Sequence, residues 1–322
     1  SNTASILMLM PVALAVLASC SDRNSLAAPL LLGLAWSCSI GGLGTPIGTP
    51  PNLILVQVYE ENTAQTISFG QWMSWGMPVV LTLLPLAWWW VTRAVPRELD
   101  IQVPAVGPWR SAERRVLVVF VLTAVAWITR AEPFGGWQTW LGLPAANDAS
   151  VALLAVVALF VVRDDQGEPL IDWAKASQIP WGVLLLFGGG ICLARAFVAS
   201  GLSAQVGDAL TAVAALPVFA MMLLLALAVT FLTEATSNTA TTALLMPVLA
   251  AVALAVEIDP LWLMVPAAMS ASCAFMLPVA TAPNAVVFGS GELPIRRMVR
   301  EGFALNLMGA LLITTVAWVL LT

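Results

Sequence analysis

The tripeptide Ser-Asn-Thr occurs twice in the chain, and its side chains could bind small ions. The first copy is at residues 1–3 and the second at 237–239; each is followed by alanine and then, at the same spacing, by Leu-Met-Pro-Val. Hydroxyl and carboxamide oxygens can coordinate a cation, while O–H and N–H groups can donate hydrogen bonds to an anion. The two tripeptides are therefore candidate ion-binding residues.

A second pair of matching segments lies downstream of the tripeptides. Residues 46–52 read Pro-Ile-Gly-Thr-Pro-Pro-Asn, residues 278–284 read Pro-Val-Ala-Thr-Ala-Pro-Asn, and four of the seven positions are identical. Because proline removes a backbone donor and glycine tolerates unusual dihedral angles, we expect the helices that contain these segments to be broken there. A single tripeptide would be read as a helix cap, but two matched pairs of segments indicate an internal repeat.

The composition is that of a helical membrane protein. Of the 322 residues 60% are hydrophobic and only 10% are charged, whereas about a quarter of a soluble domain is charged. Short apolar runs at 4–19, and at 218–232 with 240–256, predict re-entrant hairpins whose polar tips carry the tripeptides. Apolar runs of spanning length are expected at 26–58, 73–92, 116–130, 149–162, 180–199 and 302–322.

The ionisable residues argue against several other classes of protein. The net charge of −5 disfavours binding to nucleic acid, which requires a basic face. The chain has no histidine, and Lys175 is its one lysine, so the commonest metal ligand and general base are absent. The motifs offer no nucleophile paired with a base. We therefore do not expect an enzyme.

Basic residues predict how the spans are oriented, because cytoplasmic loops are enriched in Lys and Arg. Alternation of the spans puts an odd number of them between the two repeats, so the repeats would be inverted. Inverted repeats with helices broken near the midplane are typical of secondary transporters. The residues expected on the cytoplasmic side are Arg23, Arg93, Arg97, Arg110, Arg114, Arg115, Arg163, Lys175, Arg296, Arg297 and Arg300, while the opposite loops carry Glu60, Glu61, Glu132 and Asp148.

At these motifs the sequence resembles the divalent anion/sodium symporter family, whose members carry dicarboxylates, citrate and sulfate. Paired Ser-Asn-Thr motifs are the marker of that family, and the match extends to residues 44–52, 181–190 and 275–281. The resemblance implies an all-α, multi-pass integral membrane protein, with two re-entrant hairpins and two broken helices. It also implies an elevator-type secondary transporter that works as a homodimer in the bacterial inner membrane.

The family also implies a division of the chain and a set of binding residues. Residues 1–97 and 205–322 would form the transport domain, and 98–204 the scaffold and dimer contact. The residues implied for two sodium sites are Ser1, Asn2 and the backbone near Gly48 in the first, and Thr233, Asn238 and the backbone near Ala280 in the second. Those implied for the substrate are Asn2, Thr3, Thr49, Ser237, Asn238, Thr239 and Thr281.

The sequence departs from the family pattern at two places. The chain begins at Ser1, so we expect the helices that precede the first tripeptide in the family to be missing, and this polypeptide alone not to transport. Ala282 stands where the family usually repeats the double proline of 50–51. The role of Glu234, three residues before Ser237, is left open between a proton relay, tuning of the second sodium site, a hairpin cap and a surface ion pair.

Charge balance predicts that transport is coupled to cations. The four motif segments contain no Arg, Lys or His, yet a dianion is costly to desolvate without compensating positive charge. The fractional charges of helix ends are too small to balance it. We therefore expect Na⁺-coupled symport of a divalent anion, in the first place a C4 dicarboxylate such as succinate. Citrate or sulfate symport and sodium-independent exchange remain alternatives, with an anion channel less favoured because no continuous polar pore lining is evident.

Overall fold

The computed structural model describes most of the chain. The described residues are 2–96, 99, 107–131, 135–178, 185, 189, 192, 196, 200–201 and 216–321. Within them every regular element is helical, and one isolated β-bridge pairs Arg163 with Pro169. Ser1, Arg97, Glu132 and most of the segment 181–190 lie outside the described residues.

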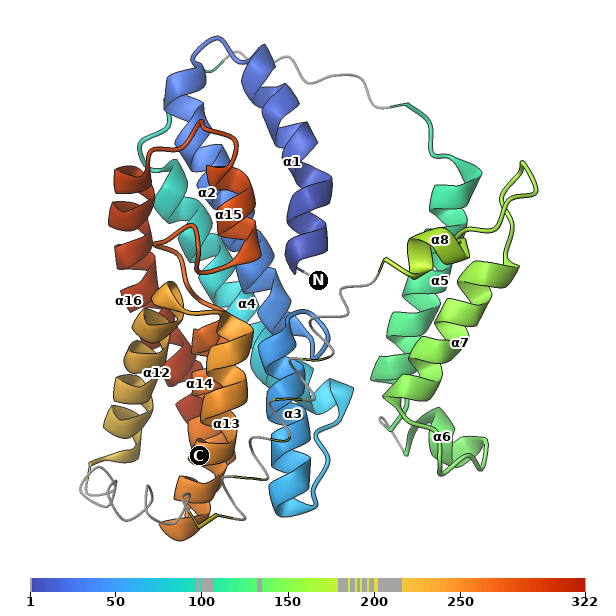
Figure 1. The fold of residues 1–322 in the computed structure, drawn as a ribbon, viewed down its shortest axis with the longest axis vertical. Helices are drawn as coiled ribbons and strands as arrows, with labels where there is room; N and C mark the ends of the chain where they lie inside the picture. The colour runs from blue at the N-terminus through green and yellow to red at the C-terminus, as the bar shows by residue number, and fades with distance from the viewer. Residues whose placement is uncertain are drawn as a thin grey trace. The chain divides into compact units, whose positions relative to one another are not determined.

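The chain divides into two compact units. The first comprises residues 1–67, 72–103 and 185–322, and the second comprises residues 68–71 and 104–184 (Figure 1). The helices of the first unit are α1 (Asn2–Ser19), α2 (Arg23–Gly41), the 3-10 helix η1 (Gly42–Gly44), α3 (Pro50–Thr63), most of α4 (Phe69–Thr92), α12 (Val218–Ala235), α13 (Asn238–Ala255), α14 (Leu261–Ala271), α15 (Ala282–Phe288) and α16 (Ile295–Leu321). Those of the second are α5 (Ser111–Ile128), α6 (Gly136–Trp140), α7 (Asp148–Val161) and α8 (Trp173–Ala176).

The described helices include six that are long and apolar enough to cross a membrane, namely α1, α2 with η1, α4, α12, α13 and α16. Four predicted spans correspond to single helices: 73–92 to α4, 116–130 to α5, 149–162 to α7 and 302–322 to α16. Helix α16 begins at Ile295 and so includes the basic residues at 296–300, which lie before the predicted span 302–322. The predicted span at 180–199 falls mostly outside the described residues.

The chain leaves the helical conformation at both motif segments. Helix η1 ends at Gly44 and α3 begins at Pro50, while α14 ends at Ala271 and α15 begins at Ala282. From these interruptions α3 and α15 run toward opposite ends of the unit (Figure 1). The interruptions follow from the sequence, since Pro fits the first turn of α3 and of α15 but would interrupt a helix interior.

Elements from the two halves of the sequence pack across one another in the first unit. Helix α3 contacts α13 and α14, and α15 contacts α1 and α2. The ring of Trp36 on α2 meets the ring of Phe275 edge-on, with 5.7 Å between the ring centroids. Both side chains are fully buried. Each helix that follows an interruption is therefore held against the tripeptide-bearing helix of the other half.

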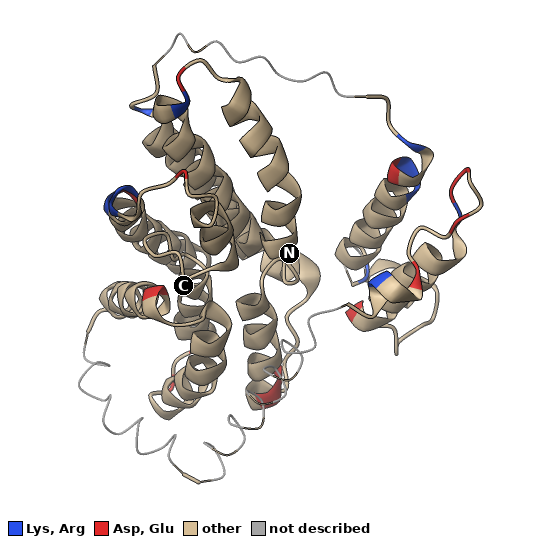
Figure 2. Ribbon diagram, turned by 45° about the horizontal axis from the view of Figure 1, so that its top comes forward, with Lys and Arg blue, Asp and Glu red and all other residues tan. Residues whose placement is uncertain are grey.

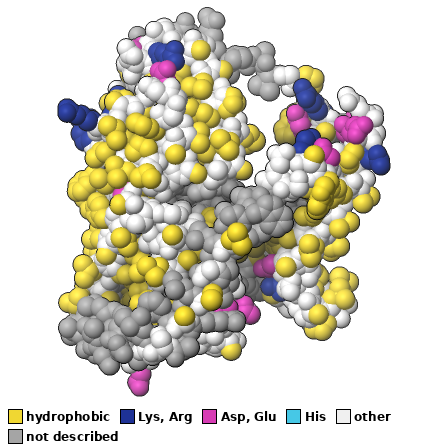
Figure 3. Space-filling model, in the orientation of Figure 1, with side chains coloured by type: hydrophobic (Ala, Val, Ile, Leu, Met, Phe, Trp, Pro, Cys, Tyr) yellow, Lys and Arg dark blue, Asp and Glu magenta, His cyan; other side chains and the backbone are white. Residues whose placement is uncertain are grey.

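Two ion pairs lie near one end of the first unit. Arg23 at the start of α2 pairs with Glu292, and Arg93 after α4 pairs with Glu301 on α16. Basic positions, drawn in blue, lie at the end of the unit where α2 and α16 begin (Figure 2). Between the ends, the visible face of the unit is largely apolar (Figure 3), which suits contact with lipid tails.

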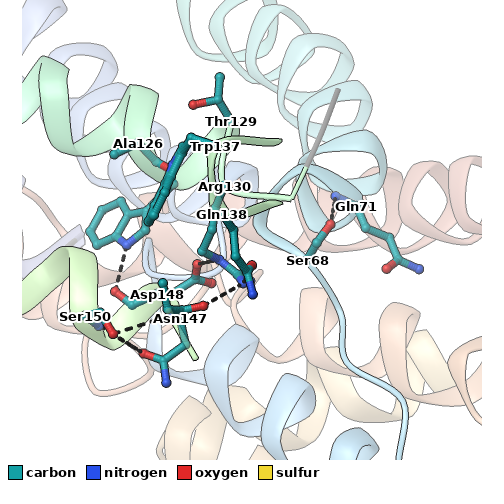
Figure 4. Close-up of polar contacts among 12 residues, drawn as sticks. Ser68, Gln71, Ala126, Thr129, Arg130, Trp137, Gln138, Asn147, Asp148 and Ser150 are labelled. Carbon is teal, nitrogen blue, oxygen red and sulfur yellow. Dashed lines mark hydrogen bonds and ion pairs between the residues drawn. The ribbon is translucent and has the colours of Figure 1, made fainter. Parts of the chain in front are cut away.

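The second unit is fastened by a polar cluster around Arg130. Its Nε donates to Asp148 Oδ1 at 2.6 Å and its Nη1 to Gln138 Oε1 at 3.0 Å (Figure 4). The indole N–H of Trp127 donates to the backbone oxygen of Asp148 at 3.0 Å, and that of Trp137 to Ala126 O at 2.8 Å. These bonds tie the end of α5 to α6 and to the start of α7.

Replacing Gly302 by alanine should destabilise the first unit. A Cβ at Gly302 would lie 2.1 Å from the carbonyl oxygen of Phe275, whereas a Cβ at Gly309 on the same helix would meet its nearest atoms at 3.8 Å. We expect Gly302→Ala to lower the unfolding free energy by about 1–3 kcal/mol. Gly309→Ala, the matched control, should be neutral or stabilising by up to about 1 kcal/mol. Thermal unfolding in detergent checks both, and equal melting temperatures for the two variants would contradict the packing.

Candidate functional site

Two buried asparagines organise the interruptions in the same way. Asn52 Nδ2 donates to the carbonyl oxygens of Gly42 at 2.9 Å and Thr45 at 2.8 Å. Asn284 Nδ2 donates to the carbonyl oxygens ten and seven residues before it, at 3.0 Å each. Both side chains are fully buried. Each carboxamide thus ties the incoming end of its helix to the outgoing end and satisfies two carbonyl groups that the interruption leaves without helical partners.

The backbone turns inside the two segments also match. Gly48 N–H donates to Thr45 O at 3.1 Å, and Ala280 N–H donates to Leu277 O at 3.3 Å. In the first segment the backbones of Gly42 and Gly48 are in contact, since a Cβ atom placed on Gly48 would lie 2.3 Å from the carbonyl oxygen of Gly42. Alanine occupies the matching position in the second segment, so that turn is less tightly closed.

Buried oxygen atoms without hydrogen-bond partners gather at both interruptions. Buried polar groups normally have partners, so an unpaired one requires an explanation such as a bound water or ion. Among the described residues, the oxygens of this kind near the first interruption belong to Ser39, Thr49 and Asn52, and those near the second to Ser270, Ser272 and Asn284. Hydroxyl, carboxamide and carbonyl oxygens are the ligands that hard cations prefer, so the donor set fits sodium.

The two tripeptides present the same geometry at the start of their helices. Asn2 Oδ1 accepts from the N–H of Thr3 at 2.8 Å, and Asn238 Oδ1 accepts from the N–H of Thr239 at 2.8 Å. Both asparagines stand at the first position of a helix, α1 or α13, where the partial charge of the helix is positive. Ser237 is exposed at the N-cap of α13 and makes no side-chain cap.

The structure brings part of the first predicted sodium site together. Asn2 on α1 and Gly48 in the interrupted segment line one cavity of about 400 Å³, together with Ser37 and Thr45. Ser1, the third residue predicted for this site, lies outside the described residues. The hydroxyl of Thr49 is buried and unpaired at the start of α3.

The residues predicted for the second sodium site lie on adjoining elements. The Thr233 hydroxyl, which is fully buried, donates to the carbonyl oxygen of Ala271 at 3.0 Å. Ala280 lies in the turn that starts beyond Ala271, and Thr281 caps α15 by accepting from the N–H of Asn284 at 3.3 Å. No hydrogen bond among the described residues joins Asn238 directly to Thr233 or Ala280.

Sequence reasoning missed three residues that build the site. Asn52 and Asn284 were visible as the last, identical position of the repeated segments, but their type alone does not show that they bind backbone carbonyls. Asn306 is a single polar residue in an apolar helix, with no repeated signal. The sequence does not reveal the partners of Glu234, which is buried and hydrogen-bonded to backbone N–H groups and therefore forms no surface ion pair.

Replacing Asn284 by aspartate should destabilise the second interruption. Aspartate would remove both N–H donors and place carboxylate oxygens against the carbonyl groups of Ala274 and Leu277. We expect a loss of about 3–5 kcal/mol of unfolding free energy, the usual cost of an uncompensated buried charge. The same change at the exposed Asn24 is the control and should have little effect. A melting temperature for Asn284→Asp equal to that of Asn24→Asp would show that the carboxamide is not required.

Sequence comparisons place the chain in a transporter family. Residues 48–322 match the family profile described as the sodium:sulfate symporter transmembrane region. The chain is 36% identical to a sodium-dependent dicarboxylate transporter, SdcS, of Staphylococcus saprophyticus, over 99% of this chain and 66% of the relative. It is 35% identical to the SdcS of Staphylococcus aureus strain RF122, over 99% of this chain and 65% of that protein.

These relatives are transporters and not enzymes, and the chain spans about two thirds of their length. The family profile covers most of the chain, and the described residues contain six helices of membrane-spanning length and apolarity. The chain therefore belongs to the sodium:sulfate symporter family, the divalent anion/sodium symporters, and is a multi-pass integral membrane protein.

Proposed function

We propose that the complete protein containing this chain is a sodium-coupled symporter of a divalent anion, and that the substrate is a C4 dicarboxylate such as succinate. The chain supplies both interrupted segments and the described parts of both tripeptides. Sodium is a co-transported substrate in this proposal. The names of the relatives, sodium-dependent dicarboxylate transporters, support both the cation and the class of anion.

One observation carries the proposal: the unpaired buried oxygens at the two interruptions. Among the described residues they belong to Ser, Thr and Asn side chains, and the motif segments contain no basic residue. Such a site attracts a cation and cannot by itself balance a dianion. A cation bound near these oxygens would supply the positive charge that the anion needs. Coupling then follows from electrostatics, because the anion is not stable there without a bound cation.

The residues proposed to hold sodium are those at the two tripeptides and turns. In the first site they are Ser1, Asn2 and the backbone of Gly48, and the cavity shared by Asn2 and Gly48 supports this set. In the second they are Thr233, Asn238 and the backbone of Ala280, for which the bond from Thr233 to the end of α14 provides support.

The anion is proposed to lie between the two tips. The N-termini of α1 and α13 offer backbone N–H groups and positive partial charge. Hydroxyl and carboxamide groups can donate to its carboxylates. The residues proposed to contact the anion are Asn2, Thr3, Thr49, Ser237, Asn238, Thr239 and Thr281.

The transport cycle is proposed to be an elevator motion of inverted repeats. Residues 1–97 and 205–322 would move as the transport domain, and residues 98–204 would form the scaffold and the contact between two protomers. The matching hydrogen bonds of Asn52 and Asn284, and the opposite directions of α3 and α15 (Figure 1), support two repeats of opposite orientation. Packing of each repeat against the other supports their movement as one body.

Uptake of radiolabelled succinate into proteoliposomes tests the function. With the protein at its full natural length, we expect saturable uptake under an inward sodium gradient and loss of uptake when potassium replaces sodium. Uptake that ignores the cation would contradict coupling and would favour exchange or a channel. Uptake of sulfate or citrate without succinate would retain the symporter and correct the anion.

Replacing Asn238 by alanine should weaken uptake at low sodium. The change removes a carboxamide oxygen from the second proposed sodium site, and we expect uptake at limiting sodium to fall about tenfold or more, the usual effect of losing one interaction with a charged group. Asn24→Ala, at an exposed position of α2, is the matched control and should transport normally. Normal sodium dependence of Asn238→Ala would remove this residue from the site.

A further inference from the structure

Glu234 is a buried carboxylate that binds the backbone of the second interrupted segment. It lies in the last turn of α12, with 4% of its surface exposed. Its Oε1 accepts from the N–H groups of Phe275 at 2.8 Å and Met276 at 2.9 Å, and its Oε2 accepts from the N–H of Leu277 at 2.8 Å. One side chain therefore holds three consecutive N–H groups that no helix satisfies.

Asn306 on α16 completes this arrangement. Its Nδ2 donates to Glu234 Oε1 at 2.7 Å, and its Oδ1 accepts from the N–H of Phe275 at 3.1 Å. The two carboxylate oxygens thus accept hydrogen bonds from N–H groups of four residues. None of the ion pairs among the described residues involves Glu234, so within that part of the chain its partners are hydrogen-bond donors and not basic side chains.

The last turn of α12 is attached to the interrupted segment at two places. Thr233 donates to Ala271 O, where α14 ends, and Glu234 binds Leu277 N–H further along. The carbonyl oxygen of Leu277 in turn accepts from Ala280 N–H at 3.3 Å and from Asn284 Nδ2 at 3.0 Å. A continuous chain of hydrogen bonds therefore runs from Glu234 through Leu277 to the turn at Ala280.

We propose that Glu234 is a positioning residue of the second sodium site, an inference that rests on the proposed function. Its carboxylate fixes residues 275–277, and through Leu277 it fixes the turn that carries Ala280. Its charge is also adjacent to Thr233 and lacks a basic partner among the described residues. In a poorly solvated interior such a charge favours a nearby cation. In this proposal Glu234 acts through the backbone that it holds and is not itself counted among the sodium ligands.

The test compares Glu234→Gln with Glu257→Gln in the full-length protein. Glutamine keeps the shape, but its amide group replaces one accepting oxygen and removes the charge. Glu257 is an exposed carboxylate after α13 and controls for a loss of charge in the same half of the chain. The first readout is thermal stabilisation of the detergent-solubilised protein by sodium, with choline as the replacement cation, and the second is the sodium dependence of succinate uptake.

We expect Glu234→Gln to raise the sodium concentration for half-maximal effect about tenfold in both readouts, as loss of a charged hydrogen bond implies. The KM for succinate at saturating sodium should stay within about twofold of wild type, since a twofold change is only about 0.4 kcal/mol. Glu257→Gln should match wild type. A folded Glu234→Gln protein with wild-type sodium dependence would overturn the proposal, and so would one that binds sodium normally but no longer transports.

Asn306→Ala keeps the test decisive if Glu234→Gln does not fold. It removes one donor to Glu234 and leaves the three backbone bonds in place, so we expect a smaller shift of about threefold in the same direction. An Asn306→Ala protein with unchanged sodium dependence would overturn the proposal. If sodium neither stabilises the wild-type protein nor drives its uptake of succinate, the proposed function itself is refuted. That outcome is distinguishable from a failure of the Glu234 proposal alone.

Discussion

The structure depends on one constraint: backbone groups released by a break in an apolar helix must find other partners. Water satisfies such groups at a protein surface, but within a membrane each unsatisfied one costs several kcal/mol. Here side chains replace the missing helical bonds. Asn52 and Asn284 bind the released carbonyl groups, and Glu234 binds the released N–H groups. Among the described residues, several buried side-chain oxygens at the two breaks still lack a partner, which makes the surroundings of both breaks favourable to a cation.

Each break has an asparagine at the matching position, but the residues around that asparagine differ between the two breaks. In the first, Gly42 and Gly48 allow direct backbone contact, and the indole of Trp72 donates to Leu43 O at 2.9 Å. In the second, the helix of Gly302 approaches the backbone of Phe275 closely, and acidic and amide side chains hold the loop. The second break thus carries a buried negative charge for which the described part of the first shows no equivalent. The two ion sites of the proposed symporter would accordingly differ in their electrostatics.

The sequence predicted the elements well because their signals are local and repeated. Apolar length indicated most of the helices, proline marked both interruptions, and glycine marked the first. The hydrogen-bond partners could not be predicted, since they depend on where distant elements pack. Asn306 meets Glu234 across 72 positions of the chain, and nothing in the sequence near either residue indicates the other. The sequence alone therefore allows four roles for Glu234, and only its structural surroundings distinguish them.

The central proposal is that a sodium ion binds at each of the two breaks. The most direct test is a cryo-EM structure of the full-length protein in lipid nanodiscs, determined in sodium and again in choline. The account predicts a density peak in sodium, absent in choline, within coordination distance of Asn2 and Gly48, and a second near Thr233 and Ala280. Maps without density at either place in sodium, at a resolution that shows ordered water, would contradict it.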